Sequence, residues 1–249
     1  MKLFFFLFCS FFSFTSAFAS DCPQHYFKGL APVVTNQKMA VKTTELCSRD
    51  YVVLHSGVVR IPLYAAEHLT RTKLSQAKGL QRRDTFRPDP RLPSGERSEL
   101  ADYSKSSFDR GHLAPSGDMS SPDAQNESFL LSNIIPQEPM NNRFLHEAIE
   151  SVVRKEAKKR GELFVVTGVV FPKSGLMYAI KNRVYVPAQI YKAVYDPKKN
   201  EAAAYLEFNS PGFNYEVVSI QSLSALAGVD IFPGVSKEVK AREIGRAHV

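Results

Sequence analysis

A short run of the sequence brings together three side-chain types that serve in hydrolysis: a carboxylate, a guanidinium and an imidazole. Asp109, Arg110 and His112 surround Gly111 in the stretch Phe-Asp-Arg-Gly-His-Leu-Ala-Pro, residues 108–115. A histidine is suited to be a general base, because its unperturbed pKa of about 6.5 leaves it largely neutral near pH 7. On its own, however, a histidine that follows a glycine is usually an ordinary surface or core residue.

Further polar residues follow this run at regular distances. Asn133 lies 21 residues after His112, and Asn142 lies nine residues after Asn133. From there, polar residues recur every four positions: Asn142, His146, Glu150 and Arg154. Because residues four apart share one face of a helix, these side chains would form one polar stripe. A solvated helix face with a Glu–Arg pair explains such a stripe as well, and His146 is interpreted as a surface residue.

In combination, these motifs strongly resemble the DNA/RNA non-specific endonuclease family. This family comprises ββα-metal (His-Me finger) nucleases and includes secreted bacterial nucleases and the mitochondrial endonuclease G. The matching positions are residues 109–115, 131–133, 136–137, 142 and 150. The resemblance is tight over residues 86–154 and looser in the strands that follow.

The resemblance implies a secreted, Mg²⁺-dependent endonuclease that cuts DNA and RNA with little regard for sequence. A phosphodiester repels nucleophiles, so its hydrolysis needs an activated water, a cation on the phosphoryl oxygens and help for the leaving alkoxide. By resemblance, His112 takes the proton from water as the general base. Asn142 gives one amide oxygen to Mg²⁺, or to Mn²⁺ in its place, and water molecules fill most other positions around an ion that sheds water reluctantly.

The resemblance also implies roles for the other site residues. Glu150 acts in catalysis by holding water molecules around the metal, and Arg110 by contacting phosphate or the developing charge. Arg154 contacts phosphate in the same way. Asn133 is grouped with the substrate-binding residues, where it would support the site rather than bind metal. Asp109 is expected to be structural, pairing within its own loop.

One departure from the family pattern concerns the loop before the motif, where the family has a further phosphate-contacting arginine. This sequence offers two adjacent arginines there, Arg82 and Arg83, and their spacing to Phe86 favours Arg82 only slightly. Both are therefore predicted as substrate-binding residues.

The elements that must position these residues follow from the hydrophobic pattern. Residues 51–55 and 58–63 flank a Ser-Gly pair and predict a β-hairpin. Residues 65–74 fit either a short helix or the end of that sheet. Residues 81–101, rich in Arg, Pro, Asp and Ser, predict a long, ordered surface loop.

The clearest helix spans residues 142–159, and Gly161 supplies its stop signal after a run of Lys and Arg. Its predicted buried stripe consists of Leu145, Ala148, Ile149, Val152 and Val153, with Ala157 as an extension. Strands are predicted at residues 128–135, where Pro136 ends the strand, and at 163–171, 184–194 and 202–208. This order predicts an α+β domain, a twisted, mainly antiparallel sheet flanked by helices with an embedded ββα-metal motif.

The two ends of the chain are set apart from this domain. Residues 1–19 have the layout of a secretory signal peptide: Lys2 precedes an almost wholly apolar run, and small residues precede cleavage after Ala19. The run is too short to span a bilayer comfortably, so we expect the mature protein to be secreted or periplasmic and free of the membrane. Residues 20–242 are interpreted as one endonuclease domain. Residues 243–249 are interpreted as a non-native tail, although a genuine polar tail also fits.

Charge and cysteine content agree with this interpretation. The formal net charge is +7, which the loss of Lys2 with the signal peptide lowers by one. A modest positive excess suits a polyanionic partner but is weak support for nucleic-acid binding. Cys9 leaves with the signal, so Cys22 and Cys47 remain as an even pair in an oxidising compartment and are expected to form a disulfide. Two cysteines are too few for a zinc module.

Two other functions remain open at the level of the sequence. A secreted protein that binds nucleic acid without cutting it would have lost His112 or Asn142, and both are present. A narrower enzyme, restricted to one nucleic acid or acting as a toxin with a dedicated inhibitor, is compatible with the motifs, because contacts to phosphate and sugar give little base readout. A homodimer is also compatible with the sequence.

Overall fold

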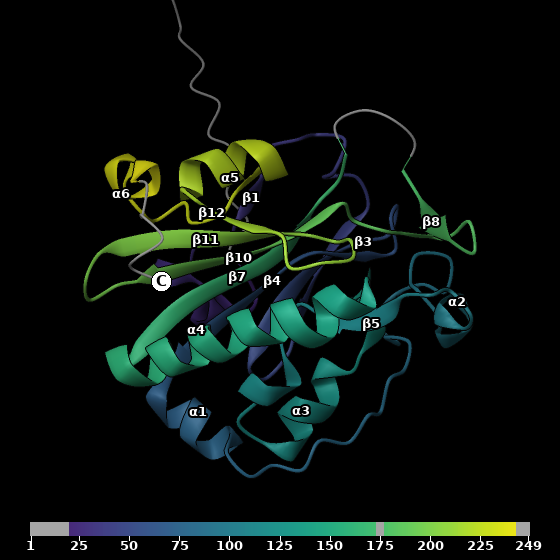
Figure 1. Cartoon of the computed structure of the whole chain (residues 1–249), viewed down its shortest axis with the longest axis horizontal. Helices are drawn as coiled ribbons and strands as arrows, with labels where there is room; N and C mark the ends of the chain where they lie inside the picture. Colours follow the sequence, from purple (N-terminus) through teal and green to yellow (C-terminus); the bar gives the residue numbers. More distant parts are fainter. Residues whose placement is uncertain (1–19, 173–176, 243–249) are drawn as a thin grey trace, which may run out of the picture.

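A seven-stranded antiparallel sheet lies at the centre of the computed structural model, which describes residues 20–172 and 177–242 (Figure 1). From one edge to the other its strands are β12 (Tyr215–Val218), β11 (Glu201–Phe208), β10 (Gln189–Asp196), β7 (Glu162–Val170), β4 (Ile61–Thr70), β3 (Tyr51–Ser56) and β2 (Thr43–Cys47). Three strand pairs lie outside it: β1 (Val33–Val34) with β13 (Val229–Asp230), β5 (Asp109–His112) with β6 (Ile134–Gln137), and β8 (Ala179–Ile180) with β9 (Val184–Tyr185). The predicted α+β class with a mainly antiparallel sheet is confirmed.

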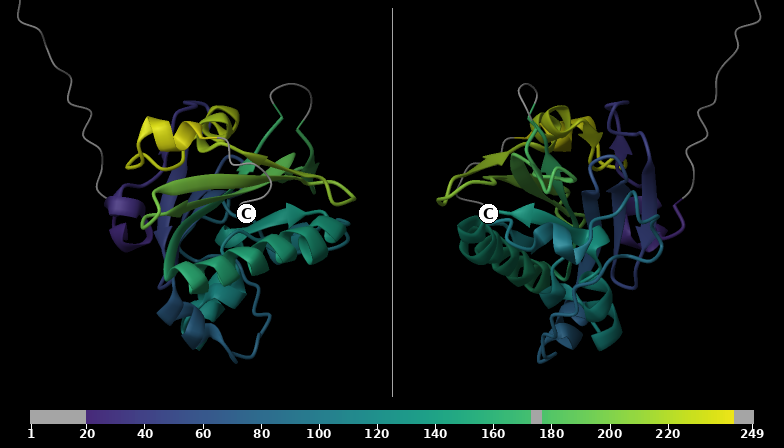
Figure 2. Two further views of the ribbon diagram at one scale, coloured as in Figure 1. Left: turned by 60° about the vertical axis from the view of Figure 1, so that its left-hand side comes forward. Right: turned by 90° about the vertical axis from the view of Figure 1, so that its right-hand side faces the viewer.

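Helices cover both faces of this sheet. They are α1 (Arg71–Ala77), α2 (Leu100–Tyr103), α3 (Pro122–Ser128), α4 (Glu147–Arg160), α5 (Ile220–Ala227) and α6 (Lys237–Ala241). Short 3₁₀ turns are η1 (Pro23–His25), η2 (Phe27–Gly29), η3 (Ser116–Asp118) and η4 (Leu131–Asn133), and a π-helical turn, η5 (Asn141–His146), leads into α4. Figures 1 and 2 show α5 and α6 on one side of the sheet and α4, with α1 and α3, on the other.

Helix α4 packs on the sheet through apolar residues spaced four apart. Leu145, Ile149, Val153 and Ala157 are buried in one cluster with Leu69, Leu163, Val165 and Tyr205. The predicted stripe is wrong at Ala148 and Val152, whose side chains are exposed, because only the residues spaced four apart face the sheet. The helix ends at Arg160, and Gly161 follows with φ 100°, a conformation that favours glycine.

The predicted β-hairpin is present as β3 and β4, which pair with each other antiparallel. Strand β4 continues to Thr70, so most of the region 65–74 is the end of the sheet and the remainder begins α1. Thr70 ends the strand and starts the helix, because its hydroxyl accepts a hydrogen bond from the backbone N–H of Lys73 at 3.2 Å. Each of the two expected alternatives therefore holds in part.

The prediction of one buried strand over residues 128–135 is wrong. Ser128 ends α3, a 3₁₀ turn follows, and strand β6 begins only at Ile134. Pro136 lies inside β6 opposite Arg110 instead of ending it. A proline is tolerated there because β6 belongs to a two-stranded pair, in which one edge needs no backbone donor.

Other regions differ from expectation in smaller ways. Residues 81–99 form an irregular, ordered loop as predicted, and α2 begins at its end. The predicted strand at 184–194 divides into β9 and β10. The C-terminal elements β12, α5 and α6 had no prediction, because their apolar runs are short.

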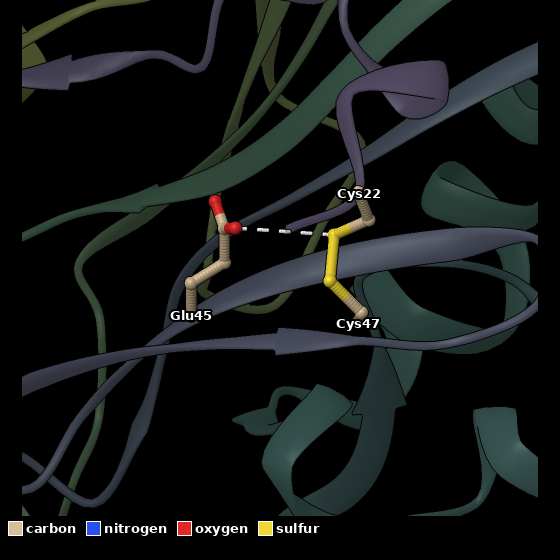
Figure 3. Close-up of side chains that lie close together, drawn as sticks. All are labelled: Cys22, Glu45 and Cys47. Carbon is tan, nitrogen blue, oxygen red and sulfur yellow. Dashed lines mark hydrogen bonds between the residues drawn. A yellow bond between two sulfur atoms is a disulfide. The ribbon is translucent and has the colours of Figure 1, made fainter. Parts of the chain in front are cut away.

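Cys22 and Cys47 form the expected disulfide, with their Cα atoms 5.8 Å apart (Figure 3). The bond joins the N-terminal segment to β2, where Glu45 also accepts hydrogen bonds from Ser20 and Tyr26. Within residues 20–172 and 177–242, no helix has the length and apolar character needed to cross a membrane. The predicted signal peptide and C-terminal tail lie outside the described residues.

Candidate active site

His112 is the last residue of β5 and lies in an aromatic setting. Its ring centroid is 5.4 Å from that of Phe86 and 5.0 Å from that of Phe129, which stands nearly perpendicular to it. The side chain is buried, and no residue that the structure describes hydrogen-bonds its Nε2. Burial, together with the nearby positive charges of Arg82, His146 and Arg110, lowers the pKa of His112 to about 3. His112 is therefore neutral near pH 7, and its Nε2 is buried without a hydrogen-bond partner in the part of the chain that the structure describes.

Two arginines flank this histidine through the same aromatic rings. The Arg110 guanidinium lies 4.2 Å from the centroid of Phe86, and that of Arg82 lies 5.2 Å from the centroid of Phe129. Arg82 also donates to Ser116 Oγ at 3.2 Å, in the turn that follows the His112 strand. Arg83 is exposed and makes no ion pair or side-chain hydrogen bond with the described part of the chain. Of the two adjacent arginines, only Arg82 thus lies beside His112.

Asn142 is oriented by the strand that carries His112. Its Nδ2 donates to Asp109 Oδ2 at 3.0 Å, and Figure 1 shows β5 beside the N-terminal end of the α4 helix. With its nitrogen engaged, the amide offers its oxygen to a metal ion. Asp109 also receives two 2.8 Å hydrogen bonds from Arg143. It therefore pairs with the turn that leads into the helix, whereas the sequence analysis had expected it to pair within its own loop. Burial alone would raise the pKa of Asp109, but the hydrogen bonds from Arg143 and Asn142 hold it below its usual value.

Glu150 and Arg154 belong to a half-buried charge cluster on α4. Arg154 Nη1 lies 3.1 Å from Asp118 Oδ1 and 3.5 Å from Glu150 Oε2. Burial, opposed by Arg154 and reinforced by the Glu150 charge, raises the pKa of Asp118 to about 6. Arg154 is therefore already neutralised by carboxylates, and it would contact a phosphate only as part of this cluster.

Asn133 is fully buried, and its side-chain amide is hydrogen-bonded to backbone groups. Its Oδ1 accepts from the N–H of Ala114 at 2.9 Å, and its Nδ2 donates to the carbonyls of Ala114 and Ser128. These bonds fix the chain just after His112. The grouping of Asn133 with substrate-binding residues does not fit this position, whereas a supporting role does.

His146 is not the surface residue that was expected. It is 2 % exposed, its Nδ1 lies 2.9 Å from Glu207 Oε1, and its Nε2 lies 3.4 Å from Glu150 Oε1 without hydrogen-bond geometry. Burial alone would lower the pKa of His146, but the Glu207 and Glu150 carboxylates raise it above its usual value. Because a charged helix residue can be buried against an acid from a distant strand, the local pattern did not reveal this contact.

Sequence reasoning missed several residues of the site. Phe129, Asp118 and Glu207 were not singled out, although all three contact residues that were. A signal existed for Glu207, which interrupts the otherwise apolar end of strand β11. Glycine is required at position 111 for a structural reason: a Cβ there would collide with the side chain of Gln137 on the paired strand.

The donor chemistry of the site fits a small hard cation. In the described residues, a group of three His, Cys, Asp or Glu side chains close enough to share an ion is found at Cys22, Glu45 and Cys47, but the two sulfurs are bonded to each other (Figure 3). The candidate site instead offers the amide oxygen of Asn142 and, eight residues further along the chain, the carboxylate of Glu150. Few oxygen ligands from protein suit Mg²⁺, which usually keeps several waters.

Several known nucleases are similar to this chain. The model of the DNA/RNA non-specific endonuclease family matches residues 32–238. The chain is 36 % identical to "Nuclease C1" of Cunninghamella echinulata var. echinulata, over 65 % of this chain and 69 % of that protein. It is 32 % identical to "Nuclease EXOG, mitochondrial" of Danio rerio, over 76 % of this chain but only 61 % of that protein. A solved structure of the EndoG/EndoGI complex has a similar fold, with a TM-score of 0.73 at 23 % identity over 81 % of this chain and 92 % of that one.

Proposed function

This chain belongs to the DNA/RNA non-specific endonuclease family, and we propose on that premise that it is an Mg²⁺-dependent endonuclease that cleaves DNA and RNA with little sequence preference. The observation that carries the proposal is the link between His112 and Asn142. A neutral imidazole ends the strand whose first residue, Asp109, orients the Asn142 amide. A proton acceptor and a metal ligand are thus held by one small ββα unit.

The side chains divide the work of hydrolysis between them. His112 accepts the proton of the attacking water, which its neutral state permits. Arg110 and Arg82, held against the rings beside His112, hold the phosphate and offset its charge. Glu150 orders water near Asn142. When bound by Asn142, Mg²⁺ would supply positive charge to the phosphoryl oxygens and the leaving alkoxide.

Weak sequence preference follows from the kind of contact. Guanidinium groups that bind phosphate carry no information on the base, and they bind DNA and RNA backbones alike. The names of the relatives, "Nuclease C1" and "Nuclease EXOG, mitochondrial", are compatible with this broad substrate class. A narrower enzyme with the same site would differ in regions that hold the bases.

We further propose that the mature protein is exported. The Cys22–Cys47 disulfide supports this, because disulfides persist mainly in oxidising compartments, and residues 1–19 have the composition of a signal peptide. Some relatives carry mitochondrial names, so fractionation of the source cell would decide between the compartments.

A digest tests the proposed function directly. Plasmid DNA, single-stranded DNA and RNA, each incubated with the purified protein and Mg²⁺, are expected to be degraded internally to short fragments without a fixed cleavage sequence. EDTA in excess of Mg²⁺ should stop all three reactions. Degradation of only one substrate would support the narrower enzyme, and binding without cleavage would support a non-catalytic protein.

The two adjacent arginines before the motif allow a matched comparison. Arg82→Ala should weaken the processing of DNA and RNA together, because Arg82 lies beside His112, and Arg83→Ala should have the smaller effect. The salt dependence of DNA binding can be measured in a His112→Ala background, in which cleavage should be greatly slowed. Adding Arg82→Ala should make the slope of log affinity against log salt concentration shallower by about 0.9, the contribution of one phosphate contact. A variant that changes the preferred cleavage sequence while keeping overall efficiency would contradict the assignment.

A further inference from the structure

One buried carboxylate holds both ends of the turn that contains Asn142. Glu207, on strand β11, is fully buried. Its Oε1 lies 2.9 Å from His146 Nδ1, and its Oε2 accepts a 3.3 Å hydrogen bond from Asn141 Nδ2. Asn141 and His146 are the first and last residues of the π-helical turn η5. The turn is therefore fastened to the sheet at both of its ends by the same side chain.

A second set of bonds connects this anchor to the ββα unit. Asn141 Oδ1 accepts a 2.6 Å hydrogen bond from Gln137 Nε2, and Asn141 Nδ2 also donates to the carbonyl of Phe208. Gln137 lies opposite Asp109 in the β5–β6 pair, and Asp109 receives the Asn142 amide. The amide of Asn142 is thus held on one side through Asp109 and on the other through Asn141 and Glu207.

A turn of this kind needs support from outside itself. π-helical segments are rare, and they occur mostly as single turns at functional sites. An unpaired carboxylate would also be costly to bury, and the imidazole of His146 and the amide of Asn141 offset that cost for Glu207. Polar partners behind a ligand commonly fix its orientation, and their loss typically weakens metal affinity or activity about 10- to 100-fold.

We propose that Glu207 is a positioning residue that, through His146 and Asn141, holds the π-helical turn so that the Asn142 amide oxygen faces the metal. This inference rests on the function proposed above. A merely structural ion pair would stabilise α4 on the sheet without any specific effect on metal binding.

The same helix offers a matched control for that alternative. Near the far end of α4, Arg160 Nη1 lies 3.1 Å from Asp196 Oδ2, and Asp196 is 2 % exposed on the neighbouring strand β10. This pair also joins α4 to the sheet through a buried acid. Glu207→Gln and Asp196→Asn therefore remove comparable charges at opposite ends of one helix.

Two measurements on the whole protein without nucleic acid separate the roles. Binding of Mn²⁺, followed by electron paramagnetic resonance, should weaken about 10- to 100-fold in Glu207→Gln and stay at the wild-type value in Asp196→Asn. Hydrogen exchange at the amides of residues 141–146 should become faster only in Glu207→Gln. If Glu207→Gln fails to fold, His146→Ala takes its place, and His146→Asn, which keeps a donor toward Glu207, should recover part of the lost affinity.

The outcomes also distinguish this inference from the proposed function. Wild-type Mn²⁺ affinity and unchanged exchange in Glu207→Gln, with a wild-type protein that cuts nucleic acid in Mg²⁺, would overturn the positioning role alone. Equal losses in both variants would overturn it as well, because they indicate general destabilisation. A wild-type protein that binds no Mn²⁺ and cuts nothing would overturn the proposed function, and the inference with it.

Discussion

Replacement of His112 by alanine is expected to lower the rate of phosphodiester hydrolysis by at least about 10²–10⁴-fold, the effect typical of a lost general base. The reason is the state of the imidazole, which burial keeps neutral. Binding of nucleic acid and of metal should persist, because Arg82, Arg110 and Asn142 remain. Single-turnover cleavage, measured beside fluorescence anisotropy of labelled DNA, separates the two effects. Added imidazole should restore part of the rate.

A second buried histidine serves as the control for this variant. His25 is also buried, burial lowers its pKa to about 4, and its Nε2 contacts the carbonyl of Ser48 at 3.1 Å near the disulfide. His25→Ala should cost stability and leave the rate per folded molecule unchanged. Near wild-type turnover in His112→Ala would rule out the assignment of the general base.

The sequence predicted the parts of the fold that depend on local pattern. Alternating and continuous apolar runs predicted the strands that became β3, β4, β7 and β11, and helical periodicity predicted part of the buried face of α4. The prediction of one strand over residues 128–135 failed because an apolar run can be buried in the core as a helix, a 3₁₀ turn or a strand. Only the pairing with β5 decides where β6 begins.

The candidate site was predicted through its motif, and its supporting contacts were not. Asp109 was expected to pair within its own loop, yet it binds Asn142 and Arg143, more than 30 residues away. His146 was interpreted as a surface residue, yet it lies against Glu207 from another strand. Contacts of this range depend on how sheet and helix meet, and neither periodicity nor spacing along one segment encodes that.

The polar interior beneath α4 shows why such residues escape pattern analysis. Lys192 is buried on β10 and donates to Thr167 Oγ1 at 2.6 Å. Glu67, on β4, is equally buried, and burial together with the nearby Asp118 raises its pKa well above the usual value. Charged side chains on inward positions of strands contradict the ordinary alternation. They are tolerated where protonation or a partner removes the unpaired charge.

Loss of the metal ligand is expected to have the other large effect. Asn142→Ala removes the amide oxygen that we assign to Mg²⁺, so metal binding at the site should be abolished and excess Mg²⁺ should rescue activity poorly. The substitution also frees Asp109 from one hydrogen bond, but Asp109 keeps both bonds from Arg143, so the fold should persist. Calorimetric titration with Mg²⁺ and thermal unfolding measure the two consequences separately.

Asn142→Asp is the matched variant, because it keeps an oxygen at the same position and changes only charge and donor. A carboxylate there would face Asp109, which now accepts the Asn142 N–H at 3.0 Å, and the two like charges repel each other. A divalent cation relieves that repulsion, so some metal binding should survive with an altered preference between Mg²⁺ and Mn²⁺. Asn142→Asp should therefore retain more metal-dependent cleavage than Asn142→Ala. If Asn142→Ala binds Mg²⁺ like the wild type, or if the wild type cuts equally well in excess EDTA, Asn142 is not the metal ligand of this enzyme.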